Sequence, residues 1–172
     1  GVLETHIHAD FAAGTRTLAE ATGADIHVSA YDEGQLYETA FPHTPMREGD
    51  AITMGKTRIE ALHTPGHTPE HLSFLVYDLA RAPEVPQVLL SGDFLFVGSL
   101  GRPDLIGEDV KRELAGKLFD SVTIKLGPLP DFVEVNPAHG AGSMCGSGIS
   151  ARPMTTLGFE RLANPYLRKG LT

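Results

Sequence analysis

Three potential metal ligands stand on alternate residues near the start of the chain, in the segment Thr5-His6-Ile7-His8-Ala9-Asp10-Phe11. If this segment is extended, successive side chains point to opposite faces, so His6, His8 and Asp10 converge on one face. Imidazole and carboxylate groups suit zinc, iron and manganese alike, so the pattern alone selects no metal. A lone His-x-His is equally compatible with polar residues that make ordinary hydrogen bonds at a strand end.

Three later segments end an apolar, strand-like run with another potential ligand, which favours the metal site. The ligands are His67 after the run 57–63, Asp93 after the run 87–91, and His139 after the run 132–136. Pro65-Gly66 breaks the first run and presents His67 from a turn. Loops at strand ends are where functional side chains gather on a rigid sheet, so these four segments predict one common metal site.

The order of these motifs resembles the metallo-β-lactamase superfamily. The matching motifs are Thr-His-x-His-x-Asp from Thr5, Thr-Pro-Gly-His-Thr from Thr64, Ser-Gly-Asp from Ser91 and Pro-Ala-His from Pro137. The resemblance implies an α/β fold, the four-layer αβ/βα sandwich with metal at the sheet edges. The segments 94–105, 137–146 and 156–165 look like the persulfide dioxygenase branch, and most resemble its members that are fused to rhodanese domains.

The residue after the motif aspartate separates two chemistries within the superfamily. Dinuclear hydrolases such as glyoxalase II carry a histidine there that helps hold a second metal, whereas this chain has Phe11, which cannot ligate a cation. The resemblance therefore implies one Fe(II) per chain, bound by the catalytic residues His6, His67 and Asp93. Two imidazoles and one carboxylate form the facial triad of non-haem iron oxygenases, which leaves positions open for dioxygen and a sulfur substrate.

Three other candidate residues resemble the remaining superfamily ligands. His8, Asp10 and His139 are expected to hydrogen-bond the ligating histidines and fix their orientation, not to bind the metal. A second interpretation of Asp10 is that its carboxylate caps a helix that starts near Ala12, and the two roles are compatible.

Arg102 lies in the segment Gly101-Arg102-Pro103-Asp104, shortly after Asp93. A guanidinium can clamp a carboxylate through two parallel hydrogen bonds. The resemblance implies that Arg102 binds a carboxylate of glutathione persulfide and presents the sulfur to the metal. The alternative is a salt bridge to Asp104 or Asp109.

The other histidines and the single cysteine have no convergent partners in the sequence. His27, His43, His63 and His71 are therefore interpreted as packing, turn or loop residues. Cys145 cannot form an intrachain disulfide, and one unpaired thiol favours a reducing compartment, so the cytoplasm is expected. In its glycine-rich loop Cys145 either contacts substrate sulfur or is a small structural residue, and the second is favoured.

Alternating strands and helices, typical of the α/β class, must position these residues. Strands are predicted over 26–30, 57–63, 72–77, 87–91 and 132–136, and helices over 12–23, 108–125 and 153–163. The first helix is expected to pack through Leu18 and Ala19 and to stop at Gly23. The second repeats apolar residues every fourth position from Val110, and the third begins with a proline.

The whole chain, residues 1–172, is interpreted as one domain. It opens inside the strand that would deliver His6, whereas the resembled family has several strands upstream. Those strands are expected to be missing or to come from elsewhere, and an open sheet edge would favour association into a homo-oligomer. A rhodanese domain or protein is the expected macromolecular partner.

Composition limits the remaining functions. The formal net charge is −8, which disfavours nucleic acid as a partner. No run approaches the roughly 18 apolar residues of a membrane span, and the start lacks a signal-peptide pattern.

The expected activity is oxidation of glutathione persulfide, or a similar thiol persulfide, by dioxygen to sulfite and thiol. The alternative enzyme is a thiolester or lactone hydrolase that uses zinc-bound hydroxide, which requires His8, Asp10 and His139 to hold metal. A third interpretation is a non-catalytic sulfur-carrying or sensing module that serves a rhodanese. Metal content distinguishes the two enzymes, and persulfide-dependent oxygen uptake excludes the third.

Overall fold

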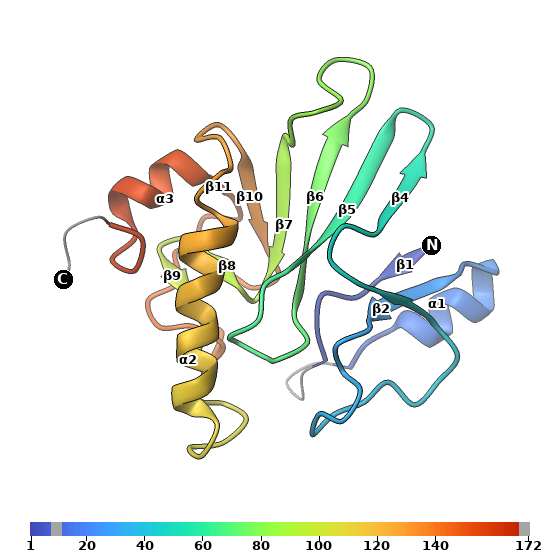
Figure 1. The fold of residues 1–172 in the computed structure, drawn as a ribbon, viewed down its shortest axis with the longest axis horizontal. Helices are drawn as coiled ribbons and strands as arrows, with labels where there is room; N and C mark the ends of the chain where they lie inside the picture. The colour runs from blue at the N-terminus through green and yellow to red at the C-terminus, as the bar shows by residue number, and fades with distance from the viewer. Residues whose placement is uncertain (8–11, 169–172) are drawn as a thin grey trace.

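The centre of the fold is a six-stranded sheet with the strand order β11-β10-β7-β6-β5-β4, shown in the computed structural model of Figure 1, which describes residues 1–7 and 12–168. The strands are β4 (Ala51–Met54), β5 (Thr57–His63), β6 (Leu72–Asp78), β7 (Val88–Gly92), β10 (Glu134–Pro137) and β11 (Thr155–Thr156). Because β6 is antiparallel to both β5 and β7, and β10 is parallel to β7, strands β5, β7 and β10 share one direction. Their C-terminal ends therefore meet at one edge of the sheet.

A smaller sheet and the helices complete the architecture. The small sheet has the order β1-β2-β3, with β1 (Val2–Leu3), β2 (Ile26–Ser29) and β3 (Thr44–Met46), and β8 (Leu95–Phe96) pairs with β9 (Ser99–Leu100). The helices are α1 (Thr15–Thr22), α2 (Lys111–Asp120), which continues as a π-helical turn over Ser121–Lys125, and α3 (Leu157–Ala163). In Figure 1, α2 and α3 lie to one side of the large sheet, and β1, β2 and α1 lie to the other.

Two apolar clusters hold these layers together, one on each face of the large sheet. Strand β6 alternates between them: Leu75 and Tyr77 join Leu118 of α2 and Leu157 of α3, whereas Phe74 packs on Met46 of the small sheet. Successive side chains of a strand point to opposite faces, so one strand supplies both interfaces. The layers follow one another in the order α2 with α3, large sheet, small sheet and α1. This is the predicted four-layer sandwich.

The first predicted helix is shorter than expected. Helix α1 begins at Thr15 with Gly14 as its N-cap residue, three residues after the predicted start at Ala12. Leu18 is 51% exposed, so its predicted packing is also wrong. The predicted stop at Gly23 is confirmed, since this glycine adopts a left-handed conformation with φ 68°.

The other two helices also start later than the sequence predicts. Helix α2 begins at Lys111, three residues after the predicted start, although the predicted apolar face is present in the buried Leu114 and Leu118. Helix α3 begins at Leu157 instead of Pro153, because the hydroxyl of Thr156 accepts a hydrogen bond from the Phe159 N–H and caps the helix there.

Across residues 1–7 and 12–168, no helix combines the length and apolar character needed to cross a membrane.

Candidate metal centre

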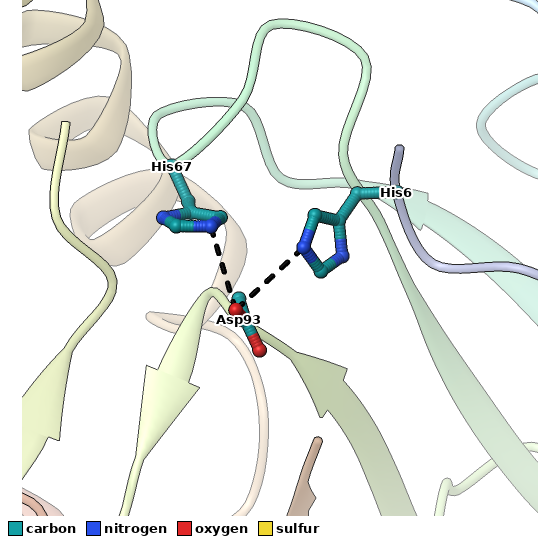
Figure 2. A group of neighbouring side chains, drawn as sticks. All are labelled: His6, His67 and Asp93. Carbon is teal, nitrogen blue, oxygen red and sulfur yellow. Dashed lines mark ion pairs between the residues drawn. The ribbon is translucent and has the colours of Figure 1, made fainter. Parts of the chain in front are cut away.

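The predicted ligands His6, His67 and Asp93 converge at the edge where β5 and β7 end (Figure 2). The Asp93 carboxylate lies between the two imidazoles: its Oδ2 atom is 3.6 Å from His6 Nε2 and 3.4 Å from His67 Nε2. One donor atom from each residue lies within 4.8 Å of the other two, and all three side chains are buried. The structure therefore brings the three predicted ligands together at one place.

The donor set fits a metal cation, and the orientation of His67 shows why. Its Nδ1 lies 2.9 Å from the backbone carbonyl of Arg102, and a carbonyl only accepts, so Nδ1 carries the proton. In the neutral ring, Nε2 then directs a lone pair toward the Asp93 carboxylate. A proton could bridge only His67 Nε2 and the Asp93 carboxylate. A metal cation would attract the carboxylate and the lone pairs of both imidazoles at once. Donation from the second ring nitrogen to a carbonyl is also typical of metal-binding histidines.

The turn that carries His67 is fixed by the helix layer. Ser121 donates a hydrogen bond to the Pro65 carbonyl at 2.8 Å. A Cβ atom at Gly66 would lie 2.5 Å from the Cβ of Leu118, so only glycine lets the turn approach α2 this closely. Packing against α2 therefore places His67 at the sheet edge.

Sequence reasoning missed the role of His71, which was interpreted as a packing or turn residue. Its Nε2 accepts a hydrogen bond from the Asp93 backbone N–H at 3.0 Å, so its Nδ1 donates to the Thr64 hydroxyl at 2.9 Å. Burial, followed by the neighbouring imidazoles, lowers the pKa of His71 well below its usual value, which keeps the ring neutral and able to accept. His71 thus positions Asp93 through the backbone. No signal in the sequence connects it to a partner 22 residues away.

His139 is a third histidine that contacts the Asp93 carboxylate. Its Nδ1 is 2.8 Å from Oδ1 and 3.0 Å from Oδ2, so the ring donates a hydrogen bond to the carboxylate. The predicted contact with the ligand set is present, although its partner is the aspartate and not a ligating histidine. The sulfur of Cys145 lies close by, within 4.8 Å of donor atoms of Asp93 and His139.

Arg102 makes the salt bridge named as the alternative to substrate binding. Its Nε and Nη2 atoms donate to the two carboxylate oxygens of Asp104 at 2.9 and 2.8 Å. These hydrogen bonds raise the pKa of Arg102 and lower that of Asp104. The Nη1 atom donates to the Met144 carbonyl at 3.4 Å, which ties the arginine to the loop after His139. Carboxylate binding by Arg102 stays a prediction.

Some of the remaining residues singled out in the sequence lie outside the described part of the chain, and others are histidines away from the site. His8, Asp10 and Phe11 lie outside the described residues, so their predicted roles stay predictions. His63 stacks on Tyr31 with ring centroids 3.8 Å apart, as a packing residue does. His43 contacts the Phe41 carbonyl in the loop before β3.

Glu70 is a buried acid beside the site that the sequence did not single out. Its Oε1 accepts hydrogen bonds from the Ile7 N–H and the Thr68 hydroxyl, both at 2.9 Å. Burial is the main cause that raises the pKa of Glu70, and these hydrogen bonds oppose it. Glu70 therefore ties the segment that carries His6 to the turn that carries His67.

Glu70→Gln is expected to change how stability depends on pH. An acid with a raised pKa stays protonated in the folded protein while the unfolded chain ionises near 4.5, so its contribution to stability falls as pH rises above that value. The amide cannot ionise, so the melting temperature of the metal-free variant should exceed that of the metal-free wild type by a margin that grows with pH. Thermal unfolding across pH 4 to 8 measures this margin. A constant difference would contradict the assignment.

Comparison with known proteins agrees with this geometry. The family model described as metallo-beta-lactamase superfamily matches residues 1–133. The chain is similar to the hydroxyacylglutathione hydrolase GloC of Haemophilus influenzae, with 28% identity over 183 residues that cover 96% of this chain and 74% of that protein.

Two solved structures extend the comparison. A metallo-beta-lactamase from Staphylococcus aureus has a TM-score of 0.88 and 41% identity, over 98% of this chain and 48% of that one. ETHE1 from Myxococcus xanthus has a TM-score of 0.72 and 29% identity, over 95% of this chain and 60% of that one. The chain thus spans about half the length of the first and 60% of the second. The chain has the four-layer sandwich, and its predicted ligands His67 and Asp93 follow β5 and β7. The family match over residues 1–133 shows that the chain belongs to the metallo-β-lactamase superfamily.

Proposed function

We propose that this chain carries the active site of an iron-dependent persulfide dioxygenase, which converts glutathione persulfide or a similar thiol persulfide to sulfite and thiol. The observation that carries the proposal is the donor set of two imidazoles and one carboxylate at a buried position. This set is the facial triad typical of non-haem Fe(II) oxygenases. The motifs around Arg102 and His139, which resemble the persulfide dioxygenase branch, support it, as does Phe11 in place of a ligand.

In the proposed reaction His6, His67 and Asp93 would hold the iron, which would supply redox chemistry for the oxidation of the outer persulfide sulfur by dioxygen. The carbonyl of Arg102 keeps the proton on His67 Nδ1, so that Nε2 stays available as a ligand. His139 donates to the Asp93 carboxylate and limits its rotation. The reaction also consumes one water, because sulfite has three oxygens and dioxygen supplies two, and the S–S bond breaks as the thiol leaves.

The first experiment is anaerobic purification followed by elemental analysis and oxygen-electrode measurements with glutathione persulfide. About one iron per chain is expected, with oxygen consumption matched by sulfite production. Reconstitution of the metal-free protein with Fe(II) should restore uptake, and reconstitution with Zn²⁺ should not. Two zinc ions per chain without oxygen uptake would overturn the proposal.

A second candidate is a zinc-dependent hydrolase of glutathione thiolesters, which the name of the Haemophilus influenzae relative favours. The position of His139 is compatible with a hydrolase. Its imidazole lies beside the Asp93 carboxylate, and a hydrolase would use it as a further metal ligand. Hydrolysis of a lactoylglutathione thiolester by the zinc-loaded protein, in the absence of oxygen, would support this candidate.

Arg102 supplies a kinetic prediction within the proposed function. If its guanidinium binds a substrate carboxylate, it must share its donors with Asp104. Arg102→Gln should therefore raise KM for glutathione persulfide about 10-fold, the effect of losing a charged hydrogen bond at a partly exposed position, with little change in kcat. Asp104→Asn should lower KM, because it removes the competing carboxylate.

Steady-state oxygen uptake with both variants checks this prediction. A persulfide without carboxylates, such as that of cysteamine, provides the control, since its KM should be the same in the wild type and in Arg102→Gln. An equal rise in KM for both substrates would mean that Arg102 acts only through its salt bridge and the loop at Met144.

A further inference from the structure

Two polar residues at the C-terminal helix are completely buried, although neither belongs to the site described above. Glu160 in α3 and Asn164, which follows α3 directly, both have an exposed fraction of 0%. The Asn164 side-chain amide donates to Glu160 Oε2 at 2.9 Å. Glu160 Oε1 is buried without a hydrogen-bond partner among residues 1–7 and 12–168. A carboxylate in this setting is costly to bury, so an interaction with a specific role is expected to offset the cost.

Both side chains reach the turn of the β8–β9 hairpin. The Gly98 N–H donates to Glu160 Oε2 at 2.9 Å, and the Asn164 amide donates to the Ser99 carbonyl at 3.1 Å. Gly98 has φ 81°, a left-handed conformation that glycine adopts without strain. Glu160 and Asn164 therefore hold the tip of this hairpin through its backbone.

The base of the same hairpin lies against the predicted metal ligands. Asp93 precedes β8, and Gly101 and Arg102 follow β9. The Arg102 carbonyl lies 2.9 Å from His67 Nδ1, and a Cβ atom at Gly101 would lie 3.0 Å from the Cβ of His67. Because β8 and β9 have two residues each, the tip and the base are only a few residues apart. A displacement of the tip should therefore reach both ligand-bearing segments.

We infer that Glu160 and Asn164 are positioning residues for the metal centre, which act through the β8–β9 hairpin on Asp93 and His67. Neither residue is itself a proposed ligand. Their hydrogen bonds fix the tip of the hairpin, and the hairpin in turn fixes the Arg102 carbonyl that orients the His67 imidazole. The inference rests on the His6–His67–Asp93 triad as the metal site of the proposed function, and not on persulfide oxidation.

Cobalt titration tests this inference without any measurement of turnover. The metal-free protein and its variants are titrated with Co²⁺ below their melting temperatures, and the visible ligand-field bands report the affinity and the geometry of the bound ion. Glu160→Ala and Asn164→Ala should each raise Kd for Co²⁺ about 10-fold, the lower end of the range for residues that orient metal ligands, and should shift the bands. Asn164→Ala keeps the hydrogen bond between Gly98 and Glu160, so it provides the test if Glu160→Ala does not fold.

Two control variants separate positioning from general stability. Glu160→Gln keeps an oxygen that can accept from the Gly98 N–H, so it should show the wild-type Kd and spectrum. Arg161→Gln changes the next residue of α3, whose guanidinium donates to the Leu126 and Leu129 carbonyls, outside the hairpin. This variant should lower the melting temperature and leave cobalt binding unchanged.

Wild-type affinity and spectra in both alanine variants would overturn the inference. So would an equal loss of affinity in Arg161→Gln, because the effect would then come from general destabilisation, or an equal loss in Glu160→Gln, which keeps the hydrogen bond. A wild-type protein that binds no cobalt would overturn the inference together with the triad. Cobalt binding without persulfide-dependent oxygen uptake by the iron-loaded protein would overturn the proposed function alone.

Discussion

Asp93→Asn is expected to reduce metal binding and oxygen uptake by more than 100-fold. Loss of a residue that only orients a ligand costs about 10- to 100-fold in metal affinity or activity. The loss at Asp93 should be larger, because Asp93 is itself a proposed ligand. It faces His6, His67 and His139, so the uncharged amide removes the only negative charge from this ligand set. The Asp93 N–H still donates to His71, so the backbone should keep its position.

Elemental analysis and oxygen-electrode rates measure the effect of Asp93→Asn. Asp109→Asn, on the exposed segment before α2, is the matched control and should keep full metal content. Circular dichroism of all three proteins establishes that they are folded. An Asp93→Asn protein that retains one iron per chain and the wild-type rate would exclude the triad as the metal site.

Gly101→Ala is expected to destabilise the protein by about 3 kcal/mol or more, the upper range for overpacking a closely packed position. A Cβ atom there would lie 1.8 Å from the Asp93 carbonyl oxygen and 3.0 Å from the Cβ of His67, so two ligand-bearing segments would have to separate. The melting temperature should fall by about 6 to 12 °C, on the scale of 2 to 4 °C per kcal/mol for a domain of this size.

Gly116→Ala provides the contrast for Gly101→Ala. Gly116 is exposed on α2, and an added Cβ would meet no atom within 4 Å. Alanine is the better helix former, so this variant should gain up to about 1 kcal/mol. Thermal unfolding compares the two variants. If both lose the same stability, the close approach of Gly101 to Asp93 does not account for the effect.

The sequence was most informative where local pattern and chemistry coincide. The run Thr57–His63 was predicted with the bounds that the structure has, because apolar alternation and the following Pro65-Gly66 turn are both local signals. His67 and Asp93 were identified for the same reason, since His67 lies in the turn after β5 and Asp93 directly follows β7. Strands β8 and β9 have two residues each, too short to show a period, and were missed.

The features that the sequence could not reveal depend on contacts between distant segments. His71 matters because its ring meets the Asp93 N–H, and Cys145 because the Gly101–Gly146 bridge carries its thiol to the same carboxylate. The start of α3 was predicted at Pro153, yet pairing of Thr155 with β10 occupies that segment as strand β11 and delays the helix to Leu157. Tertiary contacts outweighed local preference in each case.

The proposed ligands of the triad are residues 6, 67 and 93, so the site exists only after these three distant segments have folded together. An unfolded chain scatters these donors and cannot hold a cation with comparable affinity. A metal bound there would therefore act thermodynamically as a folding ligand, and saturation at 100 times Kd would add about 2.7 kcal/mol to the free energy of unfolding. In a cell, scarcity of the metal would reduce not only turnover but also the population of intact molecules.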